Sequence, residues 1–432
     1  MTEDVVRVGL LGCGHVGSAL VHLIADHADM IEARAGVRLE VSRVAVHNLS
    51  RERDVPLPAS AFTNDGAAVV DDPDIDIVVE VIGGIEPARE LIVEALKAGK
   101  PVVSANKELF ANVGRELFQT AEGAGVDILF EASVAGGIPL IRPLRESLAG
   151  DRIRRVMGIV NGTTNYILTR MAESGASFHD ALAEAQTLGY AERDPTADVE
   201  GFDAAAKAAI IASIAFGARV VAGDVYREGI SELTDADIAS AERLGYTVKL
   251  LAVAEEQPDG VAVRVHPTML PNRHPLSSVR ESFNALFIEA DAVGELMLYG
   301  RGAGGSPTAS AVLGDLIDAA KNLVSGGRGA TIGTLVRRPV LPIDEVASQF
   351  YLQLEVADQP GVLAAIADKF GAHGVSIKSM QQVGAPEGDE ARLIFITHLA
   401  READLRATVH ALRDVDSVHR VGSVLRVMGD EQ

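Results

Sequence analysis

The sequence predicts an α/β protein built from three domains, and three observations support this fold class. A chain of 432 residues exceeds one typical hydrophobic core, so several domains are expected. Short β-branched runs alternate with helical stretches over the first third of the chain. The last segment instead orders its runs as strand, helix, strand, strand, helix, strand.

Residues 1–135 are predicted to form a dinucleotide-binding domain of the Rossmann type. Strands are expected at 5–11, 38–46, 75–82, 100–105 and 126–133, with helices between most of them. This alternation predicts a parallel sheet that helices cover on both faces.

A glycine motif follows the first expected strand. Gly12, Gly14 and Gly17 have G-x-G-x-x-G spacing and lie where a helix should begin. Such glycines allow a tight turn and bring a pyrophosphate to the positive end of the helix dipole. A packing turn in an unrelated α/β domain is the alternative, and the surrounding strands and helices favour the dinucleotide.

The end of the second strand indicates which dinucleotide is bound. Asn48 lies where an acid often binds the ribose of NAD, and Arg51 and Arg53 follow it. An amide beside guanidinium groups suits a 2′-phosphate better than a carboxylate would. We therefore expect NADP, with NAD possible; two exposed arginines can also be only a solvated surface.

Two further domains are expected after the first. Residues 136–300 mix strands with an alanine-rich helix, which predicts a mixed α/β domain with its own sheet. A glycine-rich loop and helix within about 301–345 are expected to return to the first domain, and a linker should end near residue 342. Residues 348–428 have the ferredoxin-like order of elements.

Composition excludes several classes of partner. The net charge of −22 repels phosphate backbones, so we expect no nucleic acid. Cys13 is the only cysteine, which rules out an intramolecular disulfide and fits a reducing compartment. The first residues lack a basic leader, and the apolar stretch 204–223 contains Lys207 and Arg219. We expect a cytoplasmic protein without a membrane span.

Two lysines are candidates for the chemistry. Lys107 follows the fourth strand, at the sheet edge where ligands of open α/β sheets gather, although a surface lysine would fit there too. Lys207 follows Asp203 by four residues, so the two side chains share one helix face. Partial burial and a carboxylate can poise this ammonium for proton transfer, and a structural ion pair is the alternative.

The loop before Lys207 is rich in acids. Glu192 and Asp198 could bind the ammonium group of a substrate, or a hard cation, or simply be solvated near a helix N-terminus. Asp194 and Glu200 have no role that the sequence suggests.

Several blocks together resemble the homoserine dehydrogenase family. In order along the chain they are "GLLGCGHVGSAL", "EVIGGIEPA", "VVSANKELF", "FEASVAGGIPLI", "NGTTNYIL", "GYAERDPTADVEGFDAAAKAAIIA" and "YGRGAGGSPTASAVLGD". One block could arise by chance, but not the ordered series. "VADQPGVLAAIADKFGAHGVSI" resembles an ACT domain, the regulatory module that many members carry.

The resemblance implies reversible, nicotinamide-dependent reduction of L-aspartate-4-semialdehyde to L-homoserine, on the route to threonine, methionine and isoleucine. It implies that residues 136–300 form the domain for catalysis and dimerisation, with Lys207 as acid/base and Lys107 as a second essential lysine. It also implies a homo-oligomer, either dimer or tetramer. The implied substrate contacts are Glu192, Asp198, Asp203 and Lys107. The cofactor contacts, from the glycine motif, the second strand and the resemblance, are Gly12, Gly14, His15, Val16, Gly17, Asn48, Arg51, Gly83, Ser104, Lys107 and Gly302. A monovalent cation, usually sodium, is implied at Glu131, Val134, Gly136 and Ile138.

Two other functions remain open at this point. The chain could be another NADP-dependent oxidoreductase acting on a different semialdehyde or hydroxy acid, which the blocks around Lys207 disfavour. It could also be a non-catalytic amino-acid sensor, which the two lysines and Asp203 disfavour. The turn at 358–363 is where an ACT domain binds a small amino acid, so threonine feedback is expected; a tail that only dimerises is the alternative.

Overall fold

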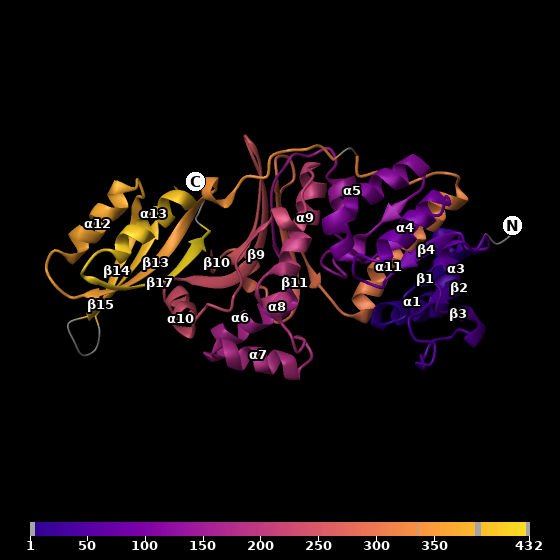
Figure 1. Ribbon diagram of the computed structural model, residues 1–432, viewed down its shortest axis with the longest axis horizontal. Coiled ribbons are helices and arrows are strands. Elements are labelled where there is room, and N and C mark those ends of the chain that lie inside the picture. The colour runs from indigo at the N-terminus through magenta and orange to yellow at the C-terminus, as the bar shows by residue number, and fades with distance from the viewer. Residues whose placement is uncertain (1–4, 334, 385–389, 429–432) are drawn as a thin grey trace.

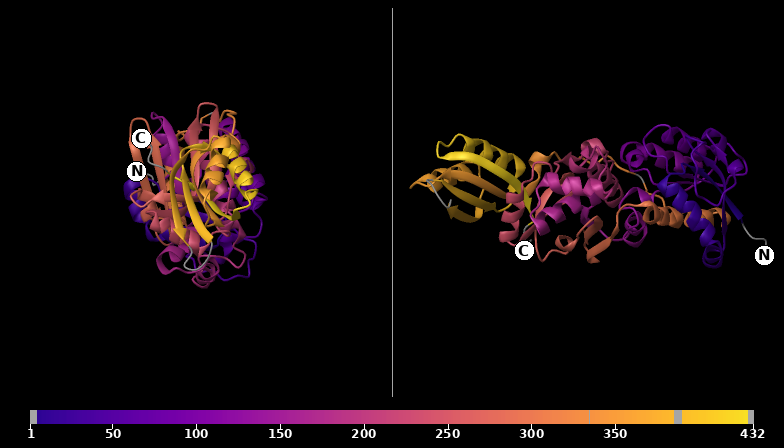
Figure 2. Two further views of the ribbon diagram at one scale, coloured as in Figure 1. Left: turned by 90° about the vertical axis from the view of Figure 1, so that its left-hand side faces the viewer. Right: turned by 90° about the horizontal axis from the view of Figure 1, so that it is seen from below.

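The three predicted domains lie in a row in the computed structural model (Figures 1 and 2), which describes residues 5–333, 335–384 and 390–428. The nucleotide-binding domain is at one end, the mixed α/β domain is in the middle, and the ferredoxin-like domain is at the other end. The predicted α/β fold class is confirmed.

The first domain is an open parallel sheet with helices on both faces. Its strands lie in the order β3-β2-β1-β4-β5-β6. The strands are β1 (Val5–Leu11), β2 (Arg38–Ala45), β3 (Phe62–Thr63), β4 (Ile77–Glu80), β5 (Val102–Ser104) and β6 (Ile128–Leu129). The helices are α1 (His15–Asp26), α2 (Ala28–Ala35), α3 (Ala67–Val70), α4 (Ala88–Lys97) and α5 (Lys107–Ala124). The expected fifth strand is shorter than predicted, because Glu131–Ser133 form a 3-10 turn.

A helix from much later in the chain completes this domain. Helix α11 (Gly305–Val324) lies among the first-domain elements (Figure 1), and its buried Val312 and Leu316 join the core formed by β1 and α1. The chain then leaves this domain, because Val336 and Leu341 hydrogen-bond to backbone carbonyls of Gly217 and Val261 in the middle domain. The returning segment is thus shorter than the predicted 301–345.

The middle domain is a mixed sheet with helices packed on it. Its strands are β7 (Ile153–Ile159), β8 (Tyr226–Arg227), β9 (Tyr246–Gln257), β10 (Gly260–Pro271), β11 (Phe283–Ala290) and β12 (Gly294–Arg301). Its helices are α6 (Gly162–Ser174), α7 (Phe178–Thr187), α8 (Thr196–Val199), α9 (Phe202–Phe216) and α10 (Asp235–Arg243).

Helix α9 is the alanine-rich helix, and it joins two domains. One side packs on β9 and β10, and another packs on α5 of the nucleotide-binding domain. Alanine side chains allow such close approach, and residues 203–213 of this helix are all buried. As a result, the first turns of α5 and α9, which carry Lys107 and Asp203, lie together.

The C-terminal domain continues the middle sheet. It contains β13 (Ala347–Ala357), α12 (Val362–Ala372), β14 (Ile377–Gly384), β15 (Glu390–Thr397), β16 (Ala400–Arg401), α13 (Glu402–Arg413) and β17 (Val418–Val427). Strand order β17-β13-β15-β14 confirms the ferredoxin-like fold. Strand β17 pairs in parallel with β10, Arg426 opposite Thr268, so one sheet runs through both domains. In the described residues, no helix combines the length and the apolarity needed to cross a bilayer.

Candidate functional site

The candidate active site centres on Asp203, in the first turn of α9. Its Oδ2 accepts a hydrogen bond from Lys207 Nζ at 2.8 Å, and its Oδ1 accepts one from Lys107 Nζ. Lys207 also donates to the carbonyl of Val160, directly after β7, at 2.7 Å. The predicted i,i+4 pairing is therefore present, and a second lysine from another domain shares the same carboxylate.

The three charges differ in access to solvent. The side chain of Asp203 is 5% exposed and that of Lys207 is 11%, whereas that of Lys107 is 39% exposed. Burial alone would raise the pKa of Asp203, but the charges of Lys207 and Lys107 and their hydrogen bonds outweigh it and hold that pKa well below its usual range. Burial alone would lower the pKa of Lys107, yet the Asp203 carboxylate leaves it raised. Both groups are therefore charged at neutral pH.

Asn161 bridges two of the acids, and sequence reasoning missed it. Its side-chain Oδ1 caps α6 by accepting the backbone N–H of Thr164 at 2.9 Å. That bond fixes the amide orientation, so Nδ2 donates to Asp198 at 2.6 Å and to Asp203 at 2.9 Å. The available signal was an Asn followed by "GTT", a helix-start pattern, within the "NGTTNYIL" block.

The other acids of the loop have separate positions. Asp198 is joined to the cluster through Asn161, whereas the exposed Glu192 lies on the same loop and its backbone carbonyl accepts from Gln186. Asp194 accepts bonds from the backbone and hydroxyl of Thr196, at the start of α8. Glu200 accepts the hydroxyl of Ser231 at 2.6 Å. The structure thus gives Asp194 and Glu200 structural contacts.

The glycine motif forms a tight turn directly before α1. Gly12 has φ +103°, and a Cβ there would lie 2.9 Å from the Val81 carbonyl. A Cβ on Gly17 would lie 2.3 Å from the Gly12 carbonyl, whereas one on Gly14 would meet open space. Gly12 and Gly17 are therefore required by packing, and Gly14 leaves room beside the exposed N-terminus of α1, where His15 and Val16 begin the helix.

A hydrogen-bonded chain links the cofactor side to Lys107. Glu80, fully buried at the end of β4, accepts the N–H groups of Ile82 and Gly83 at 2.7 and 3.1 Å. It also accepts the hydroxyl of Ser104 at 2.6 Å. Ser104 in turn accepts the N–H of Asn106, which caps α5 just before Lys107. Glu80 was not predicted; a lone acid ending the otherwise apolar strand was the signal.

The loop after β2 carries the predicted phosphate-binding residues. Asn48 and Arg51 are exposed. Arg53 instead folds inward, donating from Nε to the Cys13 carbonyl at 3.3 Å and from Nη2 to the Asn48 carbonyl at 3.0 Å. Arg53 thus ties this loop to the glycine turn, and Arg51 is the arginine free to meet a ligand.

The predicted cation segment packs against the returning loop. The Glu131 carboxylate accepts three backbone N–H groups from residues 140–142, at 2.7 Å from Ile141 and 2.8 Å from Arg142. Val134 and Ile138 are buried. Gly136, with φ +54°, approaches Gly302 so closely that a Cβ would lie 2.5 Å from the Gly302 carbonyl. Two predicted sites, for cation and cofactor, are therefore adjacent.

The chain matches family models over nearly its full length. A model described as "Homoserine dehydrogenase, NAD binding domain" matches residues 12–131, and one described as "Homoserine dehydrogenase" matches residues 139–317. An "ACT domain" model matches residues 350–417. The three matches follow the three domains in order, except that the second also covers much of α11, which packs in the first domain.

Similar proteins carry the same description. The homoserine dehydrogenase of Corynebacterium glutamicum is 51% identical over 430 residues, covering 98% of this chain and 96% of that protein. A crystal structure of a homoserine dehydrogenase from Thiobacillus denitrificans has a TM-score of 0.93 at 42% identity, with 99% of each chain covered. A hyperthermophilic archaeal homoserine dehydrogenase in complex with NADPH has a TM-score of 0.63 at 32% identity, covering 73% of this chain and 97% of that one.

Proposed function

The chain belongs to the homoserine dehydrogenase family, and from that premise we propose how its residues divide the reaction. It is an oxidoreductase that acts on a CH–OH group, and we infer reversible interconversion of L-aspartate-4-semialdehyde and L-homoserine, supplying threonine, methionine and isoleucine synthesis. The observation that carries this inference is the Lys107–Asp203–Lys207 cluster, beside a dinucleotide turn.

Lys207 is assigned the proton transfer. When bound, the nicotinamide exchanges hydride with the carbon that carries the oxygen. Two of the Lys207 N–H bonds point at Val160 and Asp203, and we assign the third to the substrate oxygen. In the reducing direction the ammonium gives its proton to that oxygen, and in the oxidising direction the amine takes the hydroxyl proton.

Asp203 and Lys107 support this step. Asp203 holds both lysines by ion pairs in a buried setting, so neither must reorient during the reaction. Lys107 is the more exposed ammonium and stabilises negative charge that develops on the substrate oxygen. Asp198 and the exposed Glu192 are assigned to the substrate ammonium group.

NADP is the proposed cofactor, with NAD as the alternative. The residues fit a dinucleotide, because Gly14 leaves open space at the N-terminus of α1. Arg51 is exposed where a 2′-phosphate would lie, and a neighbour in the family was solved with NADPH. Asn48, Gly83, Ser104 and Gly302 remain assigned to the same site.

A monovalent cation is proposed at Glu131, Val134, Gly136 and Ile138. The Glu131 carboxylate is occupied by backbone N–H groups, so main-chain oxygens would be the ligands of a sodium ion. Its position against Gly302 would connect ion binding to the cofactor loop. The expected homo-oligomer and the cytoplasmic location likewise remain predictions.

The test of the function is steady-state oxidation of homoserine with NADP and with NAD, each with and without threonine. We expect turnover with a lower KM for NADP, and inhibition through the C-terminal domain. No turnover would contradict the enzyme assignment and favour an amino-acid sensor. Unchanged activity across a threonine titration, with no thermal shift, would remove the feedback proposal.

A further inference from the structure

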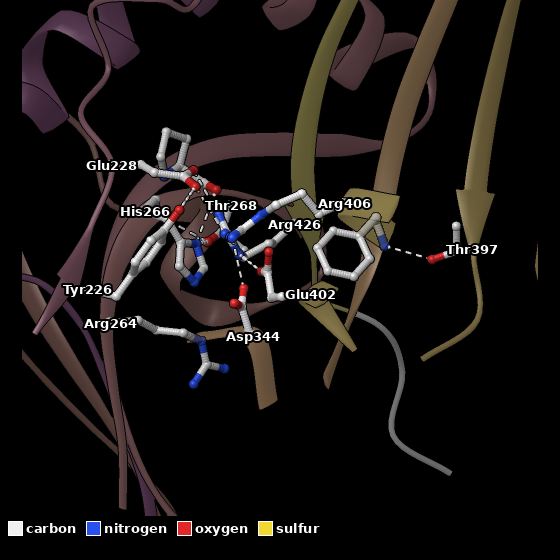
Figure 3. A network of polar contacts seen from close by, with 12 residues as sticks. Tyr226, Glu228, Arg264, His266, Thr268, Asp344, Thr397, Glu402, Arg406 and Arg426 are labelled. Carbon is white, nitrogen blue, oxygen red and sulfur yellow. Dashed lines mark hydrogen bonds and ion pairs between the residues drawn. The ribbon is translucent and has the colours of Figure 1, made fainter. Parts of the chain in front are cut away.

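Arg426 joins the C-terminal domain to the middle domain through its ion pair with Glu228 (Figure 3). Its guanidinium donates to both carboxylate oxygens of Glu228, at 2.7 and 3.0 Å, and its Nε donates to Glu402. The Arg426 side chain is only 6% exposed. Such a bidentate pair has a fixed geometry, because the planar guanidinium matches the carboxylate.

Glu228 is held on its own side as well. It directly follows β8, and its backbone N–H donates to the carbonyl of Val265 in β10 at 2.8 Å. The hydroxyl of Tyr226 donates to its carboxylate. Glu228 is therefore fixed to the sheet through its backbone and to Arg426 through its side chain.

The residues after Glu228 contact the acidic loop of the active site. The N–H of Ile230 donates to the carbonyl of Val199 at 2.8 Å, and the hydroxyl of Ser231 donates to Glu200 at 2.6 Å. Gly229 lies so close that a Cβ there would be 2.4 Å from the Val199 carbonyl oxygen. Val199 and Glu200 directly follow Asp198 in the chain.

A second contact reaches the other side of the same turn. The guanidinium of Arg227 lies over the ring of Phe202, 3.7 Å from its centroid, within cation–π range. Phe202 is the first residue of α9 and immediately precedes Asp203. Residues 226–231 thus contact both sides of the turn that joins α8 to α9, and the two acids that Asn161 bridges flank this turn, Asp198 in α8 and Asp203 in α9.

We propose that Glu228, held by Arg426, is a positioning residue that places Asp198 and Asp203 for the substrate and so connects the C-terminal domain to the active site. This inference rests on the proposed function. A movement of β17 would be passed through Glu228 to the acids. The glycine turn for the cofactor lies in another domain, so substrate affinity should respond and cofactor affinity should not.

The test uses Glu228→Gln, Arg426→Gln and the double variant in the full chain. We expect the homoserine KM to rise about 5- to 10-fold in each single variant, with the KM of the cofactor within about twofold of wild type. The homoserine KM of the double variant should be no higher than that of the more affected single variant, because both changes break the same connection. Arg426→Lys keeps the positive charge but loses the planar guanidinium, so its homoserine KM should lie between those of wild type and Arg426→Gln.

Arg401→Gln is the matched control, because it removes an exposed ion pair with Asp404 at the start of α13 in the same domain. It should leave both KM values unchanged. An unchanged homoserine KM in the Glu228 and Arg426 variants, an equal rise for the cofactor, or additive effects would overturn the proposal.

Hydrogen exchange gives a readout that does not need turnover. Backbone amides of residues 199–201 should exchange faster in Arg426→Lys than in Arg401→Gln, and equal exchange would overturn the proposal. A wild-type enzyme that oxidises no homoserine would refute the proposed function, and the exchange comparison would still decide the positioning role.

Discussion

Two charge clusters, one at each domain junction of the middle domain, have opposite compositions. Toward the nucleotide-binding domain, one carboxylate, Asp203, is shared by two lysines. Toward the C-terminal domain, one guanidinium, Arg426, is shared by two carboxylates. Lysine ammonium groups are rotatable point charges, whereas the arginine fork holds a fixed geometry. This difference fits our proposals that the first cluster transfers a proton and that the second positions one domain against another.

Replacing a lysine of the first cluster should affect the chemical step, whereas the Arg426 variants should affect the homoserine KM. Lys207→Ala should lower kcat by about 10²- to 10⁴-fold, because the proton donor and acceptor is removed. Binding of NADPH, followed by its fluorescence, should be retained within about threefold of the wild-type Kd. Normal turnover in this variant would contradict the proposal that the lysine cluster transfers the proton.

Asn161 tests whether the acids need an amide bridge. Asn161→Asp should lower kcat/KM by about 100-fold, because a third carboxylate would face Asp198 and Asp203. Asn161→Ser keeps a residue able to cap α6 and should cost only about tenfold. Wild-type kcat/KM in both variants would show that the bridge does not matter.

Arg51 tests the choice of cofactor in the neighbouring domain. Arg51→Ala should raise the KM for NADP about tenfold, the loss of one charge-assisted hydrogen bond, and leave the KM for NAD within about twofold. Arg34→Ala, which removes another exposed arginine of that domain, is the control. An equal rise in the KM for NADP and for NAD would show that Arg51 attracts either dinucleotide and does not recognise the 2′-phosphate.

The smallest effect concerns stability and pH. The lowered pKa of Asp203 means that its ion pairs stabilise the fold fully above the unfolded pKa of about 4 and less as the pH falls below it. The melting-temperature gap between wild type and Asp203→Asn should be constant from about pH 5 to pH 9 and narrow by a few degrees, about 2–4 °C, toward pH 3. A gap that widens in acid would contradict the charged carboxylate.

Local sequence patterns predicted much of the fold and one of the two ion pairs that Asp203 makes. Gly12, Gly14 and Gly17 specify a turn by their spacing alone, and Asp203 and Lys207 meet because helix geometry fixes an i,i+4 pair. The order of strands and helices was sufficient for the Rossmann-type and ferredoxin-like domains.

The contacts that could not be predicted join residues far apart in the sequence. Lys107 reaches Asp203 only because α5 packs on α9 across a domain junction. The pairing of β17 with β10 was also missed, since a strand's hydrophobic pattern does not reveal its partner. The roles of Asn161 and Glu80 depend on tertiary hydrogen bonds that no spacing encodes.

Chemical rescue of Lys207→Ala tests the central claim most directly. Small primary amines such as methylamine can enter the space left by the side chain and supply the missing proton donor and acceptor. We predict that homoserine oxidation by this variant rises with amine concentration, whereas wild type is not stimulated. A variant that still binds NADPH but is rescued by no amine would contradict Lys207 as the acid/base.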